Sequence, residues 1–132
     1  PCRSQLWHRD MEDTRIVKAF LYLSDVVPGA GPLIYARGTQ RGGALADRMP
    51  ATYLEPGSGW VRASDAAIAA MVVPAGAWQC AYGPIGTLVV ADTAGWHKGG
   101  YATSASRLTA TWEWTTAEAI DGSRFHALGG QP

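Results

Sequence analysis

Apolar and polar side chains alternate along several short stretches of this chain, a pattern typical of half-buried β-strands. The clearest stretch covers residues 15–24. Its apolar face consists of Val17, Ala19, Leu21 and Leu23. Its opposite face is chemically mixed and suits the wall of a pocket: Lys18, Phe20 and Tyr22. The pattern therefore predicts a strand with one apolar face and one face suited to line a pocket.

Weaker patterns predict further short strands, separated by turns rich in glycine and proline. These strands are expected at residues 4–10, 33–36, 51–54, 78–82, 86–91 and 108–116. Residues 92–106 are expected to form a loop that contains His97. The one predicted helix covers residues 66–71, because Ser64 can cap its first turn and Asp65 places an acid there.

Many short strands at close spacing are typical of a β-sandwich or barrel and not of a parallel α/β sheet. We expect one mainly β domain over residues 1–120, followed by a tail at 121–132 that shows no periodicity. The six tryptophans are assigned mainly to the core and the pocket wall, because large aromatics dominate core energetics. Arg9, Lys98 and His126 are assigned to the surface.

Composition excludes several classes of protein. Lys+Arg and Asp+Glu are both 11 in 132 residues, so a basic face for nucleic acid is not expected. No apolar run approaches the roughly 20 residues that a membrane-spanning helix needs. Cys2 and Cys80 form neither a disulfide framework nor a zinc spacing, which favours a reducing, cytoplasmic compartment. Because the chain begins at Pro1 without a methionine, we expect it to be the C-terminal part of a longer protein.

The candidate chemistry lies in Trp7-His8-Arg9-Asp10, taken together with His97 and Arg107. His8 and Asp10 are two residues apart, so on an extended segment their side chains point to the same face. A second imidazole from His97 would complete the set of two histidines and one carboxylate that holds non-haem Fe(II) with open coordination positions. The residues alone also permit a plainer interpretation, in which His8 and His97 are ordinary strand and loop histidines and Arg107 is a solvated charge.

Longer motifs resemble one family, the phytanoyl-CoA dioxygenase-like Fe(II)/2-oxoglutarate oxygenases. The matching stretches are S-Q-L-W-H-R-D at 4–10, V-K-A-F-L-Y-L-S-D-V at 17–26, G-P-L-I-Y-A-R-G-T-Q at 31–40 and G-T-L-V-V-A-D-T-A-G-W-H-K-G at 86–99, with Arg107 after them. They occur in the family's order over most of residues 4–116. The resemblance implies a double-stranded β-helix (a jelly-roll, cupin-like barrel) whose N-terminal part is missing from this chain.

The resemblance also implies roles for individual residues. His8, Asp10 and His97 match the iron ligands, and Arg107 matches the arginine that binds the distal carboxylate of 2-oxoglutarate through two parallel hydrogen bonds. Phe20 falls where the family often has an aromatic side chain lining the co-substrate pocket. Lys18 and Tyr22 share its face and are further candidates for this contact, although a strand lysine lies more often at the surface.

The function implied is hydroxylation of a small organic molecule with Fe(II), 2-oxoglutarate and O₂, releasing succinate and CO₂. Asp10 favours hydroxylation over halogenation, because related halogenases have a small residue at that position. Two alternatives stay open: a non-catalytic jelly-roll with a vestigial metal site, and a different cupin-type metalloenzyme. The substrate and the oligomeric state are not indicated by the sequence.

Overall fold

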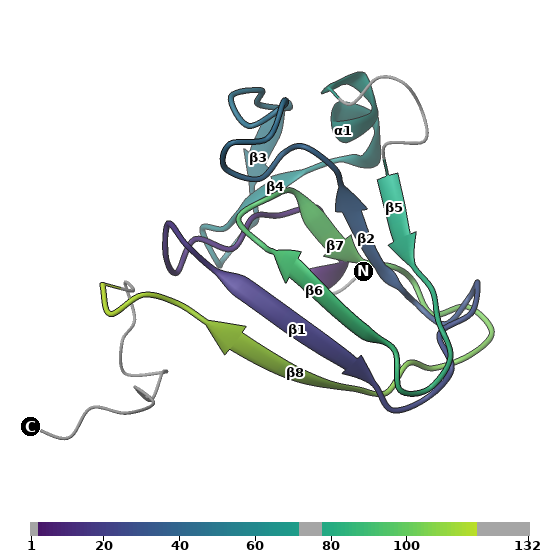
Figure 1. Cartoon of the computed structure of the whole chain (residues 1–132). Helices are drawn as coiled ribbons and strands as arrows, with labels where there is room; N and C mark the ends of the chain where they lie inside the picture. The colour runs from purple at the N-terminus through teal and green to yellow at the C-terminus, as the bar shows by residue number, and fades with distance from the viewer. Residues whose placement is uncertain (1–2, 72–77, 119–132) are drawn as a thin grey trace, which may run out of the picture.

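The computed structural model describes residues 3–71 and 78–118, which are mainly β (Figure 1). Its elements, in chain order, are a short 3-10 helix at Arg3–Gln5, β1 (Val17–Tyr22), β2 (Leu33–Ala36), β3 (Thr52–Leu54), β4 (Val61–Ala63), α1 (Asp65–Met71), β5 (Trp78–Ala81), β6 (Leu88–Asp92), β7 (His97–Gly99) and β8 (Thr109–Trp114). Most of the predicted strands are therefore confirmed. Within the described residues, no helix is long and apolar enough to cross a membrane.

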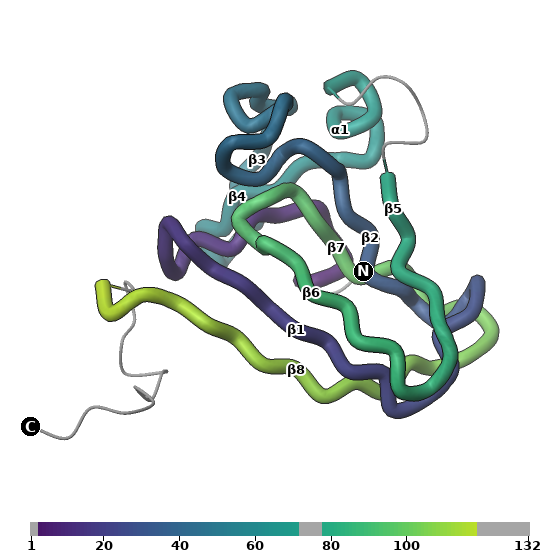
Figure 2. The backbone as a smooth tube through the Cα atoms, viewed as in Figure 1, coloured from purple at the N-terminus to yellow at the C-terminus, as the bar shows by residue number. Residues whose placement is uncertain are grey.

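The first sheet consists of β6, β1 and β8 in that order, with antiparallel pairing throughout. The backbone path in Figure 2 shows the three strands running side by side. Lys18 of β1 lies directly opposite Ala91 on one neighbour and Glu113 on the other, so these three side chains share a face. The register therefore places Lys18, on the mixed face of β1, next to the carboxylate residue Glu113 of β8.

The second sheet consists of β5, β2 and β7, again antiparallel. Beyond β7 it continues through two isolated bridges: His8 pairs with His97, and Trp7 pairs with Ala63 of β4. The predicted strand over residues 4–10 is thus wrong in extent, because Arg3–Gln5 is helical and only Trp7 and His8 form bridges. His97 was expected in a loop, but it begins a strand of three residues.

Two tyrosines show that the sheets face one another. The Tyr22 hydroxyl, from the first sheet, donates to the carbonyl of Ala81 in the second, at 2.6 Å. The Tyr35 hydroxyl, from the second sheet, donates to the carbonyl of Asp92 in the first, at 2.8 Å. The face that carries Lys18, Phe20 and Tyr22 is therefore the inner face of its sheet.

The apolar face of β1 consequently points outward. Several large side chains on this outer face, or beside it, are exposed by 39–62% of their area: Val17, Leu23, Leu88, Val90, Leu108, Trp112 and Trp114. The assignment of the tryptophans to the core is wrong for Trp112 and Trp114, although Trp7 and Trp96 are buried. The space between the sheets is polar near Lys18 and apolar around Tyr22.

The main apolar core lies on the outer side of the second sheet, beneath α1. It contains Trp7, Ala36, Ala63, Ile68, Met71 and Trp96. The helix begins as predicted, with the Ala67 amide donating to the Ser64 hydroxyl at 3.1 Å. Asp65, in the first turn, accepts a hydrogen bond from the Trp7 indole, which ties the helix to the segment that carries His8. The predicted tail at 121–132 lies outside the described residues.

Thr39 links the end of β2 to the start of β7, and its hydroxyl offers a test of this packing. The hydroxyl donates to the Ala36 carbonyl at 2.7 Å and accepts from the Trp96 amide at 2.8 Å, in a fully buried position. Thr39→Val keeps the shape but leaves both groups unpaired, so we expect the free energy of unfolding to fall by about 1–3 kcal/mol.

Urea denaturation measures this loss, and Thr39→Ser is the matched control. Serine keeps the hydroxyl and removes only a methyl group, at a cost of about 1 kcal/mol. If the valine variant is as stable as the serine variant, the hydroxyl does not have the role described here.

Candidate metal centre

His8 and His97 are held side by side by a reciprocal pair of backbone hydrogen bonds. The amide of each donates to the carbonyl of the other at 3.0 Å, and the two ring centroids lie 4.3 Å apart. Asp10 continues the same extended segment, with its amide donating to the Thr93 carbonyl at 2.9 Å. Because side chains alternate along extended backbone, Asp10 lies on the same face as His8. The three side chains that the sequence predicted to converge are therefore brought together.

The tautomer of each imidazole follows from its backbone contact. His8 Nδ1 lies 2.7 Å from the Leu6 carbonyl oxygen, and His97 Nδ1 lies 2.9 Å from the Gly95 carbonyl oxygen. A carbonyl can only accept, so each Nδ1 carries the proton and donates it. Each Nε2 then keeps a free lone pair, which is the arrangement found in metal-binding histidines.

The donor set fits a metal ion. Nε2 of His8 lies 3.8 Å from Asp10 Oδ1, and Nε2 of His97 lies 3.7 Å from Asp10 Oδ2. Ligand atoms that each bind one metal at about 2.1 Å are separated from one another by roughly 3–4 Å. One ligand atom from each residue lies within 4.8 Å of the others, and all three residues are buried. His8, Asp10 and His97 could therefore hold a metal ion.

Burial and neighbouring charges shift the pKa values of these three side chains. Burial lowers the pKa of His8, and burial together with the proximity of His8 lowers the pKa of His97 to about 4. Burial alone would raise the pKa of Asp10, but His97 and Lys18 outweigh it and the net shift is downward. Two neutral imidazoles and one carboxylate are the protonation states that metal binding requires.

Lys18 is half-buried, which contradicts the expectation that a strand lysine lies at the surface. Its ammonium group lies 2.7 Å from Asp10 Oδ2 and 3.2 Å from Glu113 Oε2. Burial opposes its charge, but Asp10 and Glu113 raise the pKa of Lys18 above its ordinary value. Lys18 thus balances the charge of the Asp10 carboxylate within the site.

Arg107, Tyr22 and Phe20 line the same intersheet space, beyond Lys18. Arg107 lies close to β7. A methyl group built on the Cα of Gly99, two residues beyond His97, would be 3.8 Å from Arg107 Nη2. The other terminal nitrogen of Arg107, Nη1, is buried without a hydrogen-bond acceptor among the described residues. Burial raises the pKa of Tyr22 while the nearby guanidinium of Arg107 opposes the rise, so these two side chains are in contact. Phe20 packs against the small apolar cluster around Tyr22.

Two charged residues that were assigned to the surface have structural roles instead. Lys98 is only 5% exposed; its ammonium group pairs with Asp65 and lies 5.2 Å from the centre of the Trp7 ring. Arg9 is half-buried and donates from Nη2 to the Thr39 carbonyl at 2.9 Å. Side chains alternate along extended backbone, so Lys98 is expected on the face opposite His97, and Arg9 on the face opposite His8 and Asp10. This alternation is the sequence signal that could have placed both residues away from the candidate ligands. His126, the third such residue, lies outside the described residues.

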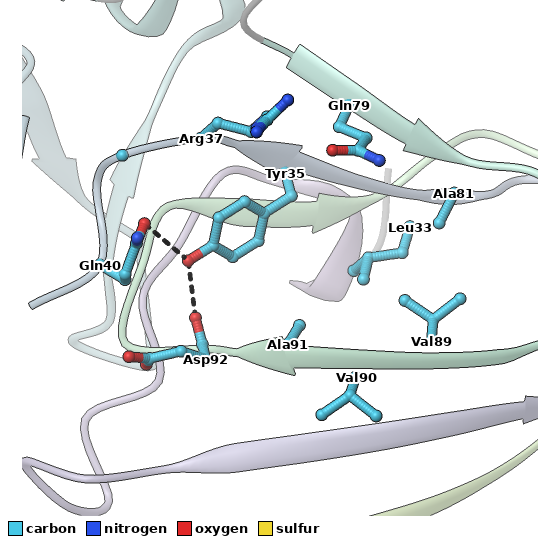
Figure 3. A pocket seen from close by; sticks show the side chains of 11 residues that line it. Leu33, Tyr35, Arg37, Gln40, Gln79, Ala81, Val89, Val90, Ala91 and Asp92 are labelled. Atoms are coloured by element: carbon cyan, nitrogen blue, oxygen red, sulfur yellow. Dashed lines mark hydrogen bonds between the residues drawn. The ribbon is translucent and has the colours of Figure 1, made fainter. Parts of the chain in front are cut away.

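Two cavities flank the intersheet space. One, of about 330 Å³, opens between β5 and β6 (Figure 3). There the Tyr35 hydroxyl points toward the Asp92 carbonyl and Gln40, and burial raises the pKa of Tyr35 to about 12. None of the three candidate ligands lines this cavity. The other, of about 490 Å³, has Asp10 in its wall. The second cavity is therefore the one adjacent to the candidate metal centre.

No protein-family model and no curated protein matches this chain. The chemistry of the site is therefore inferred from its geometry.

Metal binding is the first test of this centre. With Co(II) as the probe at about 100 times its Kd, the free energy of unfolding should rise by about 2.7 kcal/mol, because the ion binds only the folded protein. His97→Ala and Asp10→Asn should each weaken Co(II) binding at least tenfold, as loss of one ligand implies. Calorimetric titration and thermal melts measure both effects. Asp47→Asn, which changes an exposed carboxylate, is the control and should bind Co(II) normally. Unchanged binding by Asp10→Asn would contradict the assignment.

The pH dependence of the metal-free protein tests the burial of His97. The pKa of His97 is about 4 in the folded chain, against an ordinary value of 6.5. As the pH falls below about 6.5, the unfolded chain takes up a proton that the folded chain excludes, so stability decreases toward pH 4. The full shift is worth on the order of 3 kcal/mol.

Urea denaturation in EDTA across this pH range should show a steep loss for the wild type. The loss should be shallower for His97→Gln, which stays neutral throughout. Parallel curves for the two proteins would show that the folded state does not exclude the proton from His97.

Proposed function

We propose that this protein is an Fe(II)- and 2-oxoglutarate-dependent dioxygenase that hydroxylates a small organic molecule. The observation that supports this proposal is the convergence of His8, Asp10 and His97 in a buried site, with both Nε2 lone pairs free. Two imidazoles and one carboxylate are typical of non-haem Fe(II) oxygenases, in which open coordination positions receive the co-substrate and O₂. Fe(II) with 2-oxoglutarate supplies the activation of O₂ that converts C–H to C–OH, with release of succinate and CO₂.

The fold that accompanies the proposal is a double-stranded β-helix. It is supported by two facing antiparallel sheets with strand orders β6-β1-β8 and β5-β2-β7. Each sheet joins strands that are distant in the sequence, as expected when the chain passes back and forth between two sheets. The candidate ligands then lie at one end of the space between the sheets.

The chain's own residues suit the binding of 2-oxoglutarate inside this space. Arg107 offers a buried Nη1 without an acceptor, and its guanidinium lies beside Gly99, on the same face of β7 as His97. Two residues of strand span about 6.6 Å, which is similar in scale to a five-carbon dicarboxylate. Arg107 would hold the distal carboxylate through charge-assisted hydrogen bonds, and Phe20 would exclude water along the chain of the co-substrate.

Lys18 is proposed to position the Asp10 carboxylate. Its ammonium group bridges Asp10 and Glu113, so it restrains the orientation of the Asp10 carboxylate within the site. A lysine at this distance also lowers the negative charge that a bound dication would otherwise meet, and so moderates metal affinity. This position supports a role beside the ligand Asp10 and not direct contact with the distal carboxylate.

Two other functions are separated from this one by simple measurements. A non-catalytic binding domain would bind metal but form no succinate. A different metalloenzyme on a similar barrel would work without 2-oxoglutarate and would be insensitive to Arg107.

The proposal is tested by succinate formation from 2-oxoglutarate with Fe(II), ascorbate and O₂. Arg107→Leu should raise the KM for 2-oxoglutarate by roughly 10- to 100-fold, because a charged hydrogen bond is worth about 1.5–3 kcal/mol. Co(II) binding should remain unchanged in this variant, which separates co-substrate binding from metal binding. Arg37→Leu removes an exposed arginine and is the matched control. Absence of succinate from the metal-loaded wild type, or an unchanged KM in Arg107→Leu, would refute the proposal.

A further inference from the structure

Residues 92–97 join the end of β6 to the start of β7, and their carbonyl groups hold two of the three candidate ligands. The Thr93 carbonyl accepts from the Asp10 amide at 2.9 Å, and the Gly95 carbonyl accepts from His97 Nδ1, also at 2.9 Å. Because a carbonyl only accepts, the Gly95 contact also keeps the proton of the His97 ring on Nδ1. The position of this 92–97 segment therefore sets the orientation of the His97 imidazole.

One side chain of β2 holds the start of the 92–97 segment. The Tyr35 hydroxyl donates to the Asp92 carbonyl at 2.8 Å, as Figure 3 shows. The same carbonyl accepts from the Gly95 amide at 3.2 Å, which uses the second of its two lone pairs. Consecutive hydrogen bonds thus connect the phenol to the imidazole, from Tyr35 to Asp92, from Asp92 to Gly95, and from Gly95 to His97.

Gly95 and the phenol of Tyr35 are packed so closely that no side chain fits at position 95. A Cβ built there would overlap the hydroxyl oxygen, and it would lie 2.6 Å from Tyr35 Cζ and 3.1 Å from the Gln40 amide nitrogen. Gly95 is not among the glycines with positive φ, so the lack of space, and not the backbone conformation, is what requires glycine. The phenol therefore contacts the Gly95 backbone directly, in addition to holding it through the Asp92 carbonyl.

The register of the second sheet also brings Tyr35 beside His97. The two residues lie directly opposite one another in the antiparallel pair of β2 and β7. Opposite residues of such a pair project to the same face, with Cβ atoms about 4.5–5.5 Å apart. Tyr35 therefore projects from the strand position next to His97, on the same face as the imidazole.

The other tyrosine that crosses between the sheets differs in what it holds. The Tyr22 hydroxyl donates to the Ala81 carbonyl of β5, a strand that contributes no candidate ligand. Tyr35 instead donates to the segment whose carbonyls hold two of the ligands. Loss of a bond of the first kind lowers stability alone, whereas loss of the Tyr35 bond also releases the group that orients a ligand.

We propose that Tyr35 is a positioning residue whose hydroxyl, acting through the 92–97 segment, orients the His97 imidazole. The hydroxyl fixes the Asp92 carbonyl, and the Gly95 peptide that follows holds Nδ1 of the ring. Nε2 of the ring is thereby kept on the side of Asp10, at 3.7 Å from its Oδ2. That this orientation serves a metal ion rests on the proposed function. The role requires a hydroxyl at position 35 and no side chain at position 95.

The test compares the wild type with Tyr35→Phe, which removes only the hydroxyl. In imidazole ¹⁵N spectra of the metal-free full chain at neutral pH, His97 should be protonated at Nδ1 in the wild type and should show both tautomers in the variant. In the Co(II)-saturated proteins, the visible d–d bands, which report ligand geometry, should differ. The Kd for Co(II) should rise roughly tenfold in the variant, the lower end of the loss expected when a group behind a metal ligand is removed. Ser24→Ala removes a hydroxyl bonded to the Leu108 amide at 3.0 Å and is the matched control, which should change neither spectrum.

If Tyr35→Phe keeps both the wild-type His97 signal and the wild-type Co(II) bands, the proposal is overturned, even when the variant is less stable. Gly95→Ala crowds the same contact from the other side and should also give both tautomers; an unchanged His97 signal in this variant would overturn the proposal as well. The metal-free spectra do not depend on metal binding. A tautomer change in Tyr35→Phe, together with a wild type that binds no Co(II), would refute the metal centre and leave the positioning of His97 standing.

Discussion

The structure depends on the reciprocal backbone pairing of His8 and His97. This single pair joins residues 89 positions apart in the sequence, and it is the contact through which the N-terminal segment extends the second sheet. The same pairing sets both imidazoles on one face, and the carbonyls two residues before each ring fix its tautomer. The backbone therefore determines the chemistry of the two imidazoles before any ligand arrives.

The polarity of the domain follows from this arrangement. A buried site with three ionisable side chains needs counter-charges and polar walls, so Lys18 and Glu113 occupy the inner face of the first sheet near Asp10. The strictly apolar face of β1 then points outward. Hydrophobic stabilisation is supplied by the core beneath α1 and by the small cluster around Tyr22, which lies in the intersheet space beyond Lys18. The two tyrosines that cross between the sheets hold the interior at a fixed width.

Much of this could be predicted from the sequence, and the errors have physical reasons. The alternation over β1 predicted the strand and the content of each face, but alternation alone does not say which face is inside. Trp112 and Trp114 were assigned with the other tryptophans to the core and pocket wall because of their size, although they are half-exposed. β7 has three residues, too few to show a period, so His97 was expected in a loop and the burial of Lys98 was missed. The convergence of His8, Asp10 and His97 was predicted correctly because two-residue spacing survives such errors, whereas the position of the Arg9 side chain depends on contacts with residues 39 and 46 that no local pattern encodes.

The exposed apolar side chains on the outer face of β6, β1 and β8 will determine how readily the protein self-associates in solution. Leu88 and Val90 on β6 and Trp112 on β8 leave exposed apolar side chains on one face of the same sheet, with β1 between the two strands. Such a face favours self-association, and sulfate-type salts strengthen hydrophobic contacts. The chain carries no net charge that would oppose this through mutual repulsion. Low-sulfate buffers and a pH away from 7.3 should therefore keep it dispersed at the concentrations that spectroscopy requires.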